Sequence, residues 1–283
     1  MHRSYLGGSL REVFALLMVF LILTSAAYIL PAVAADSEEE MPREWYGRRK
    51  VVDRIGKYVR IAIIHYLTDV GDPDKDGAED GYALLGVYWN LSRYSTGVPY
   101  IINPSGGVKQ GLSEASIVSE IKAALESWDW AVDLDNYRPP DKVRHRIELY
   151  NDEPLINYKA KASIGTPDLR NVISWGRAQP GVVAYAVIWY IPNSGEIVDA
   201  DIVLNSYYRW GIADGDEATS DLVGKFDIRN IVAHEAGHWT GLDDIYDPNY
   251  SAMTMYGYAD FGEEIKRSLE PGDIAGAQAI YRV

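Results

Sequence analysis

Apolar and polar residues follow two periods along the chain, and each period predicts a type of secondary structure. Short apolar or alternating runs predict strands over 59–67, 84–89, 99–102, 145–150, 171–175, 182–191 and 196–204. The last two runs flank Pro192-Asn-Ser-Gly195, whose composition is typical of a hairpin turn. We therefore expect the last two strands to pair with each other.

Three segments have the spacing of amphipathic helices. Ser113 is expected to cap a helix over 113–128. The apolar side of this helix carries Ile117, Ile121, Ala124, Leu125 and Trp128. A second helix is predicted over 226–240, where Gly241 stops it, and a third over 272–281. Strands and helices in this order predict an α+β fold, in which helices pack on a sheet.

Composition narrows the class of protein. The chain has 283 residues, of which 47% are hydrophobic, so it can form one domain of about 200 residues with additional segments. A net charge of −14 argues against binding to nucleic acid or to an anionic membrane. The absence of cysteine excludes disulfides and thiolate zinc sites. Residues 41–60 form a basic stretch within this acidic chain, and we expect them to be a solvated face.

The first 35 residues are typical of an export signal. Basic residues precede an apolar run over 13–30, and Pro31-Ala-Val-Ala-Ala35 supplies a small-residue cleavage site. The sequence thus predicts a secreted protein. The apolar run is also long enough for a retained anchor, which would hold the protein on the outer face of the cell membrane.

The stretch His234-Glu-Ala-Gly-His238 carries the strongest chemical signal. Residues four apart share one face of a helix, so His234 and His238 can bind one ion. Glu235 can reach a water on that ion without being a ligand. A zinc ion with an adjacent carboxylate base is the arrangement that metal-assisted hydrolysis needs.

A catalytic zinc usually has a third protein ligand. Gly241 can turn the chain back toward the metal, and Asp244 follows three residues later. Asp243 and Asp247 are close competitors, although the spacing favours Asp244. Another alternative takes the third ligand from Glu263 or Glu264.

The pattern over 234–244 resembles the metzincin zinc signature HExxHxxGxxH, with aspartate in place of the last histidine. The same replacement is found in the snapalysin family, and 241–246 is similar to its GLPDxY motif. Downstream, Met255-Tyr256 is similar to the methionine turn of the matrixins, with Ser251-x-Met253 as a second register. Residues 268–281 resemble the matrixin C-terminal helix, and 183–186 resemble the strand at the edge of its cleft.

The resemblance covers roughly 81–283 and implies a metzincin fold. That fold is a twisted, mixed five-stranded sheet packed on a long helix and the active-site helix, with a small C-terminal subdomain that holds the methionine turn and final helix. It also implies a zinc endopeptidase in which Glu235 is the general base toward a zinc-activated water. Tyr258 and Ala184 would line the substrate pocket, and the strand near 183–187 would bind substrate by strand addition.

Two departures from the family pattern change the expectation. Tyr185 and Val203 stand where histidines of a second, structural zinc would be, so we expect one zinc per chain. Residues 36–80 match no known motif, so they are interpreted as an N-terminal extension or a prosegment before a catalytic domain over 81–283. An aspartate from 69–80 could occupy the zinc before activation.

Asp72, Asp74 and Asp76 have the alternating spacing of a calcium loop, and a merely acidic turn is the alternative. The partners expected are a protein or peptide substrate and no nucleic acid, and the chain is expected to be a monomer. A membrane would be a partner only if the N-terminal apolar segment is retained. The alternative to an enzyme is a non-catalytic, exported, calcium-stabilised binding module with a relic zinc site.

Overall fold

A computed structural model of the chain describes residues 40–67, 80–132, 148–214 and 222–281. The predicted export signal and the predicted calcium ligands Asp72, Asp74 and Asp76 lie outside the described residues. In the part of the chain that the structure describes, no helix has the length and apolar character needed to cross a membrane.

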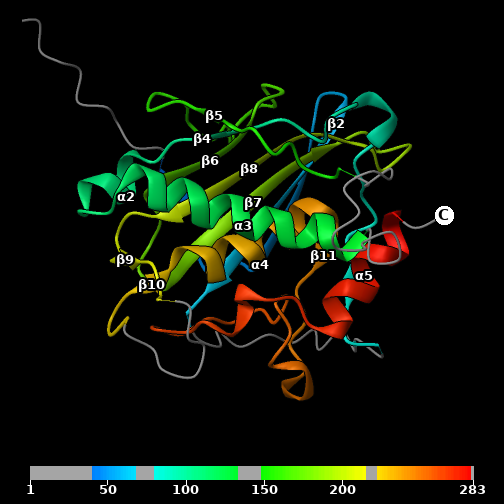
Figure 1. Cartoon of the computed structure of the whole chain (residues 1–283). Helices are drawn as coiled ribbons and strands as arrows, with labels where there is room; N and C mark the ends of the chain where they lie inside the picture. Colours follow the sequence, from blue (N-terminus) through cyan, green and yellow to red (C-terminus); the bar gives the residue numbers. More distant parts are fainter. Residues whose placement is uncertain (1–39, 68–79, 133–147, 215–221, 282–283) are drawn as a thin grey trace, which may run out of the picture. The chain divides into compact units, whose positions relative to one another are not determined.

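A mixed sheet of seven strands forms one layer of the molecule (Figure 1). In spatial order the strands are β1 (Lys50–Ile55), β2 (Tyr58–Tyr66), β7 (Val182–Tyr190), β8 (Ile197–Asn205), β6 (Asn171–Gly176), β4 (Tyr100–Ile102) and β5 (Leu155–Ile156). β6 pairs in parallel with both β4 and β8. β7 pairs antiparallel with both β8 and β2. The predicted hairpin of β7 and β8 is thereby confirmed.

The number of strands differs from the predicted five. Residues 100–205 supply five strands, β4 to β8, and residues 50–66 add β1 and β2 beyond β7. The apolar run of β2 explains this addition, because its side chains are buried on both faces of the sheet. Ile61 and Ile63 belong to the core under the helices, and Ala62 and Ile64 belong to a cluster on the opposite face. Such a strand is stable only inside a sheet.

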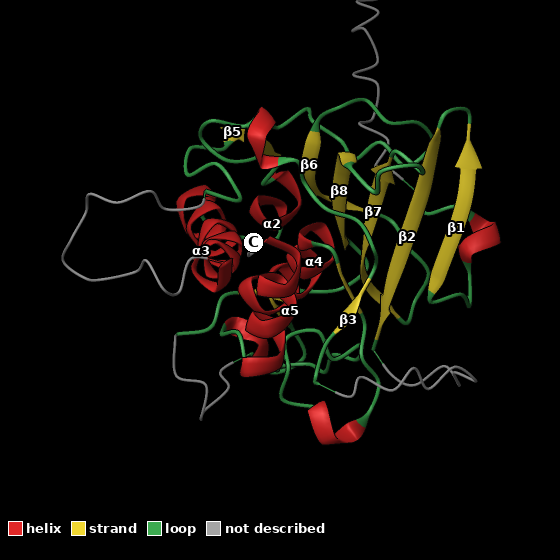
Figure 2. Cartoon of the chain, turned by 90° about the vertical axis from the view of Figure 1, so that its right-hand side faces the viewer, coloured by secondary structure: helices red, strands yellow, loops and turns green. Residues whose placement is uncertain are grey.

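The helices cover one face of the sheet (Figure 2). They are α2 (Ser105–Lys109), α3 (Glu114–Val132), α4 (Ile228–Thr240) and α5 (Pro271–Tyr281). The predicted cap is confirmed, since the Ser113 hydroxyl accepts the amide of Ser116 at 3.0 Å. All five predicted apolar positions of α3 are buried. The α+β class follows from sequence and structure alike.

Short elements connect these layers. β3 (Ala83–Leu84) pairs with β11 (Leu242–Asp243), and β9 (Trp210–Gly211) pairs with β10 (Phe226–Asp227). Four 3-10 helices are η1 (Arg43–Trp45), η2 (Leu91–Arg93), η3 (Pro248–Tyr250) and η4 (Ile265–Arg267).

One predicted strand is wrong. Of the run 84–89 only Leu84 belongs to a strand, as the last residue of β3, because Gly86 has a φ of 75° and turns the chain. The predicted strand 145–150 lies partly outside the described residues. In its described part Tyr150 forms an isolated parallel bridge with Val98, and the amides of Leu149 and Tyr150 donate to the Asp129 carboxylate.

Candidate metal centre

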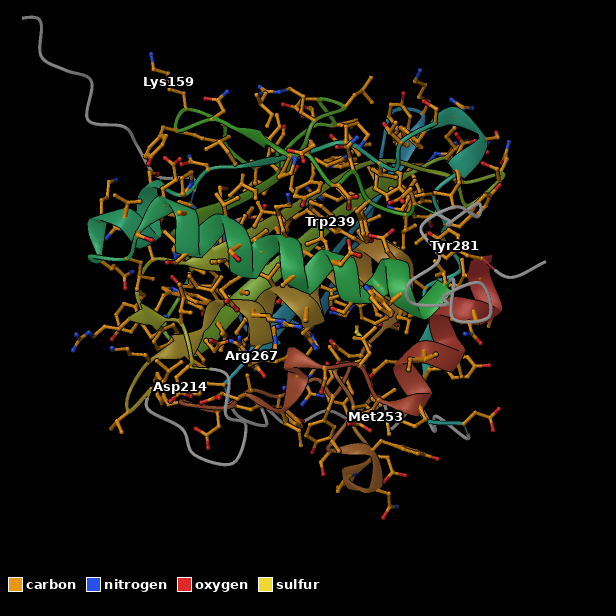
Figure 3. The ribbon with its side chains drawn as sticks, in the orientation of Figure 1. Lys159, Asp214, Trp239, Met253, Arg267 and Tyr281 are labelled. Carbon is orange, nitrogen blue, oxygen red and sulfur yellow. The ribbon has the colours of Figure 1, made fainter. Side chains whose placement is uncertain are left out.

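Both ends of α4 are fixed by local contacts. At its start the Asp227 carboxylate accepts the amide of Asn230 at 2.7 Å. The Arg267 guanidinium (Figure 3) donates to both oxygens of Asp227 at 2.8 Å, and so ties η4 to the helix. At its end Gly241 has a φ of 112°, as the sequence predicts for a C-cap. A side chain at this position would be strained and would also meet the backbone of Val87.

After Gly241 the chain returns to the histidines. One oxygen of Asp244, Oδ1, lies 3.1 Å from Nε2 of His234 and 3.5 Å from Nε2 of His238. Ligands about 2.0–2.2 Å from a tetrahedral zinc are separated from one another by about 3.3 Å. Asp244 Oδ1 therefore lies at the spacing of zinc ligands from both imidazoles, and the His234, His238 and Asp244 ligand atoms all lie within 4.8 Å of one another.

Hydrogen bonds orient both imidazoles toward one point. Nδ1 of His234 lies 2.7 Å from the carbonyl of Thr254, and Nδ1 of His238 lies 2.9 Å from the carbonyl of Leu242. A carbonyl can only accept, so each Nδ1 carries a proton, and the Nε2 atom of the neutral ring is the one left to bind a metal. Both Nε2 atoms and Asp244 Oδ1 are buried and form no hydrogen bond with any described residue. Orphaned donor atoms of this kind suit a metal ion.

Three of the four competing carboxylates contact other groups. Asp243 forms an ion pair with Lys50, and Asp247 caps η3 by accepting the amide of Asn249. Glu263 lies 2.9 Å from the ammonium of Lys266. Among the described residues, neither Glu263 nor Glu264 lies in a group of potential ligands with the histidines.

A turn beneath the site connects α4 with α5. Met255 is fully buried, and a side chain on Gly237 would overlap its sulfur. The carboxylate of Asp273 in α5 accepts the amides of Thr254 at 2.8 Å and Met255 at 3.0 Å. Because Thr254 also holds His234, Asp273 fixes the turn and the ligand together. Met253, labelled in Figure 3, lies away from α4 and packs at Gly272.

Glu235 is fully buried, and neither of its oxygens has a hydrogen-bond partner among the described residues. Burial raises the pKa of Glu235 to about 8. A buried carboxylate without a hydrogen-bond partner among the described residues, adjacent to two potential ligands, is a candidate for proton transfer.

His65 is the residue of the site that the sequence analysis missed. It lies in β2 and is fully buried, with Nδ1 at 3.5 Å from Oε1 of Glu235. Its ring centroid is 4.0 Å from that of His234. Neither nitrogen of His65 has a hydrogen-bond partner among the described residues. The available signal was a histidine, one of five in the chain, within a strongly apolar strand.

The predicted pocket residues Ala184 and Tyr258 contact residues of the segment 49–66. Ala184 is fully buried and faces His65 in the ladder between β7 and β2. Arg49 donates a hydrogen bond to the hydroxyl of Tyr258. The prediction that the basic stretch is a solvated face is therefore wrong for Arg49, which is half-buried, whereas Lys50 is exposed and forms an ion pair with Asp243 at the rim of the site.

Tyr185 and Val203 pack in the apolar cluster on the sheet face opposite the helices. The Tyr185 ring meets the edge of Trp45 at a centroid distance of 6.1 Å. These two positions thus serve packing on that face.

Comparison of the chain with known proteins found no matching family model, no similar curated protein and no similar solved structure. Functional inference therefore rests on the residues of the site.

Proposed function

We propose that the protein is a zinc-dependent endopeptidase. His234, His238 and Asp244 would hold the ion, because their donor atoms are buried, have no hydrogen-bond partner among the described residues and lie within 4.8 Å of one another. When bound, zinc supplies Lewis-acid chemistry toward a peptide carbonyl and makes water a competent nucleophile near neutral pH. The observation that carries the proposal is the uncommitted carboxylate of Glu235 beside this ligand set.

Glu235 is the general base of the proposed reaction. Its oxygens are free to take a proton from the attacking water and to return it to the leaving amine. A purely structural zinc site has no use for this carboxylate.

The proposal includes a metzincin-type, matrixin-like catalytic domain with a snapalysin-like zinc motif. The five strands β4 to β8, the long helix α3, the active-site helix α4, the turn at Met255 and the final helix α5 correspond in order to the parts expected from the sequence resemblance. A secreted monomer acting on proteins or peptides, with Tyr258 near its substrate pocket, completes the proposal.

One observation favours the non-catalytic alternative. His234, Glu235 and His238 are completely buried, as they would be in a closed structural site. His65 and β2 cause part of this burial, so the enclosure belongs to the N-terminal segment as well as to the site.

Metal content and peptide hydrolysis, measured together, test the proposal. The dialysed full chain should retain one zinc, and casein should be hydrolysed by the full chain or by its His65→Ala variant, which uncovers Glu235. Chelation should abolish the hydrolysis. A zinc-loaded protein that cleaves no casein in either form would establish the binding-module alternative, and two tightly held zinc ions would contradict the single-site expectation.

A further inference from the structure

The strand beside the candidate site is supplied by the chain itself. β2 pairs with β7 from Val59 opposite Tyr190 to Tyr66 opposite Val182. If the proposed function is right, an extended peptide would bind by adding a strand to β7. β2 already makes that ladder, in antiparallel orientation, so a peptide and β2 compete for the same edge.

The same strand carries a side chain into the site. His65 lies opposite Ala184 and points toward α4, where its ring rests 4.0 Å from that of His234. Its Nδ1 is 3.5 Å from Glu235. The imidazole therefore occupies the neighbourhood of the base in which an attacking water would have to lie.

Arg49, just before β1, and Lys50, its first residue, contact the rim of the site. The guanidinium of Arg49 lies 4.1 Å above the ring of Tyr246, whose hydroxyl donates to Asp244 at 2.9 Å. Lys50 forms an ion pair with Asp243, beside the same ligand. Tyr66 also forms a backbone bridge with Tyr258. Three separate contacts thus connect residues 49–66 to the loop that follows α4.

We propose that residues 49–66 are an autoinhibitory hairpin that holds the site closed. β2 takes the place of a peptide substrate along β7, and His65 takes the place of the attacking water beside Glu235. Arg49 and Lys50 fasten the hairpin to the loop that carries Asp244. Removal of the His65 side chain uncovers Glu235, and full access of a peptide to β7 requires that β2 separate from it.

The closed state is stable because β2 is buried on both of its faces. Ile61 and Ile63 pack under the helices, and Ala62, Ile64 and Tyr66 pack on the other side. Removing these apolar side chains from water stabilises the closed state. Thermal fluctuation alone therefore opens the site rarely.

Access to the metal tests this proposal without relying on catalysis. The full chain is loaded with Co²⁺, whose visible spectrum reports its ligands, and is titrated with acetohydroxamate, a small metal-binding probe. His65→Ala should bind the probe about tenfold or more tightly than the parent chain, since a closed state lowers apparent affinity by the open fraction. Its spectrum before titration should also differ if His65 contacts the ion.

A second variant covers the case in which His65→Ala does not fold. Arg49→Ala combined with Lys50→Ala removes the rim contacts and leaves the buried strand intact, so it should also tighten probe binding. Val52→Ala, an exposed position in β1 (59% exposed), is the matched control and should leave probe binding unchanged.

Equal probe affinity in the parent chain and in every variant that folds would overturn the autoinhibitory hairpin. That result would not bear on the proposed function, which zinc content and casein hydrolysis test separately. Failure of the proposed function is a different result, because Co²⁺ would then bind without any hydrolysis by the opened variants.

Discussion

Asp273 and Glu235 are both fully buried carboxylates, and their surroundings are opposite. The oxygens of Asp273 accept three backbone amides, those of Thr254, Met255 and Glu270, at 2.8–3.0 Å. Glu235 accepts no hydrogen bond from any described residue. Burial alone therefore does not separate the structural residue Asp273 from the candidate catalytic residue Glu235. The lack of hydrogen-bond partners separates them, since buried polar groups are almost always paired.

Glu235→Gln gives the largest expected effect. In the His65→Ala chain it should lower casein hydrolysis by roughly 10²- to 10⁴-fold, because the base is removed while the proposed ligands stay. Zinc content and thermal stability should be close to those of His65→Ala alone, since no hydrogen bond is lost. Near-normal cleavage by this variant would contradict the assigned role.

Asp244→Ala should strip the metal. Its Oδ1 is the one atom close to both Nε2 atoms, so its removal leaves two ligands where three are needed. Metal analysis after dialysis should show well below one zinc, with activity lost as well. Glu263→Ala and Glu264→Ala are the matched controls and should keep the ion. Loss of zinc in either control, with zinc retained in Asp244→Ala, would replace the proposed ligand set.

Asp273→Asn should lower folding stability, whereas Glu235→Gln should lower hydrolysis and leave stability unchanged. The amide would direct its NH₂ group at a backbone N–H, so the variant should lose about 1–3 kcal/mol of folding stability. Because Asp273 holds the turn that orients His234, zinc should also bind more weakly. Denaturant unfolding of the apo and zinc-loaded protein measures both effects. An unchanged midpoint in both forms would mean that the amide contacts are dispensable.

Asp129 offers the smallest effect and a pH test. Burial raises the pKa of Asp129 to about 8, while its backbone hydrogen bonds oppose that shift. The folded state therefore holds a proton that the unfolded chain releases near pH 4. This contribution to stability is complete below that pH and declines as the pH rises toward 8.

Asn keeps the acceptor oxygen, so Asp129→Asn should melt at a higher temperature than the parent at pH 8. A gain of 1 kcal/mol corresponds to about 2–4 °C. The two proteins should converge at pH 4, and a difference independent of pH would contradict the assignment.

Local patterns predicted what depends on neighbours in sequence. The i, i+4 spacing places His234 and His238 on one face of α4, and Gly241 reverses the chain so that Asp244 reaches them. The apolar side of α3 and the hairpin of β7 and β8 were predicted for the same reason. A run of apolar residues was insufficient at 84–89, because one glycine with positive φ turns the backbone there.

The sequence by itself determined the zinc-ligand candidates, the base and the α+β class, because helix periodicity and turn residues act over a few positions. Only the tertiary structure decided that His65 joins the site. It lies 169 positions before His234, and the register of β2 on β7 brings the two rings together. The partner of a strand depends on where its apolar faces can be buried in the whole molecule. A strand that is apolar on both faces can be buried beside several different strands, so its sequence does not specify its partner. In the structure β2 pairs with β7, and this pairing places His65 beside His234.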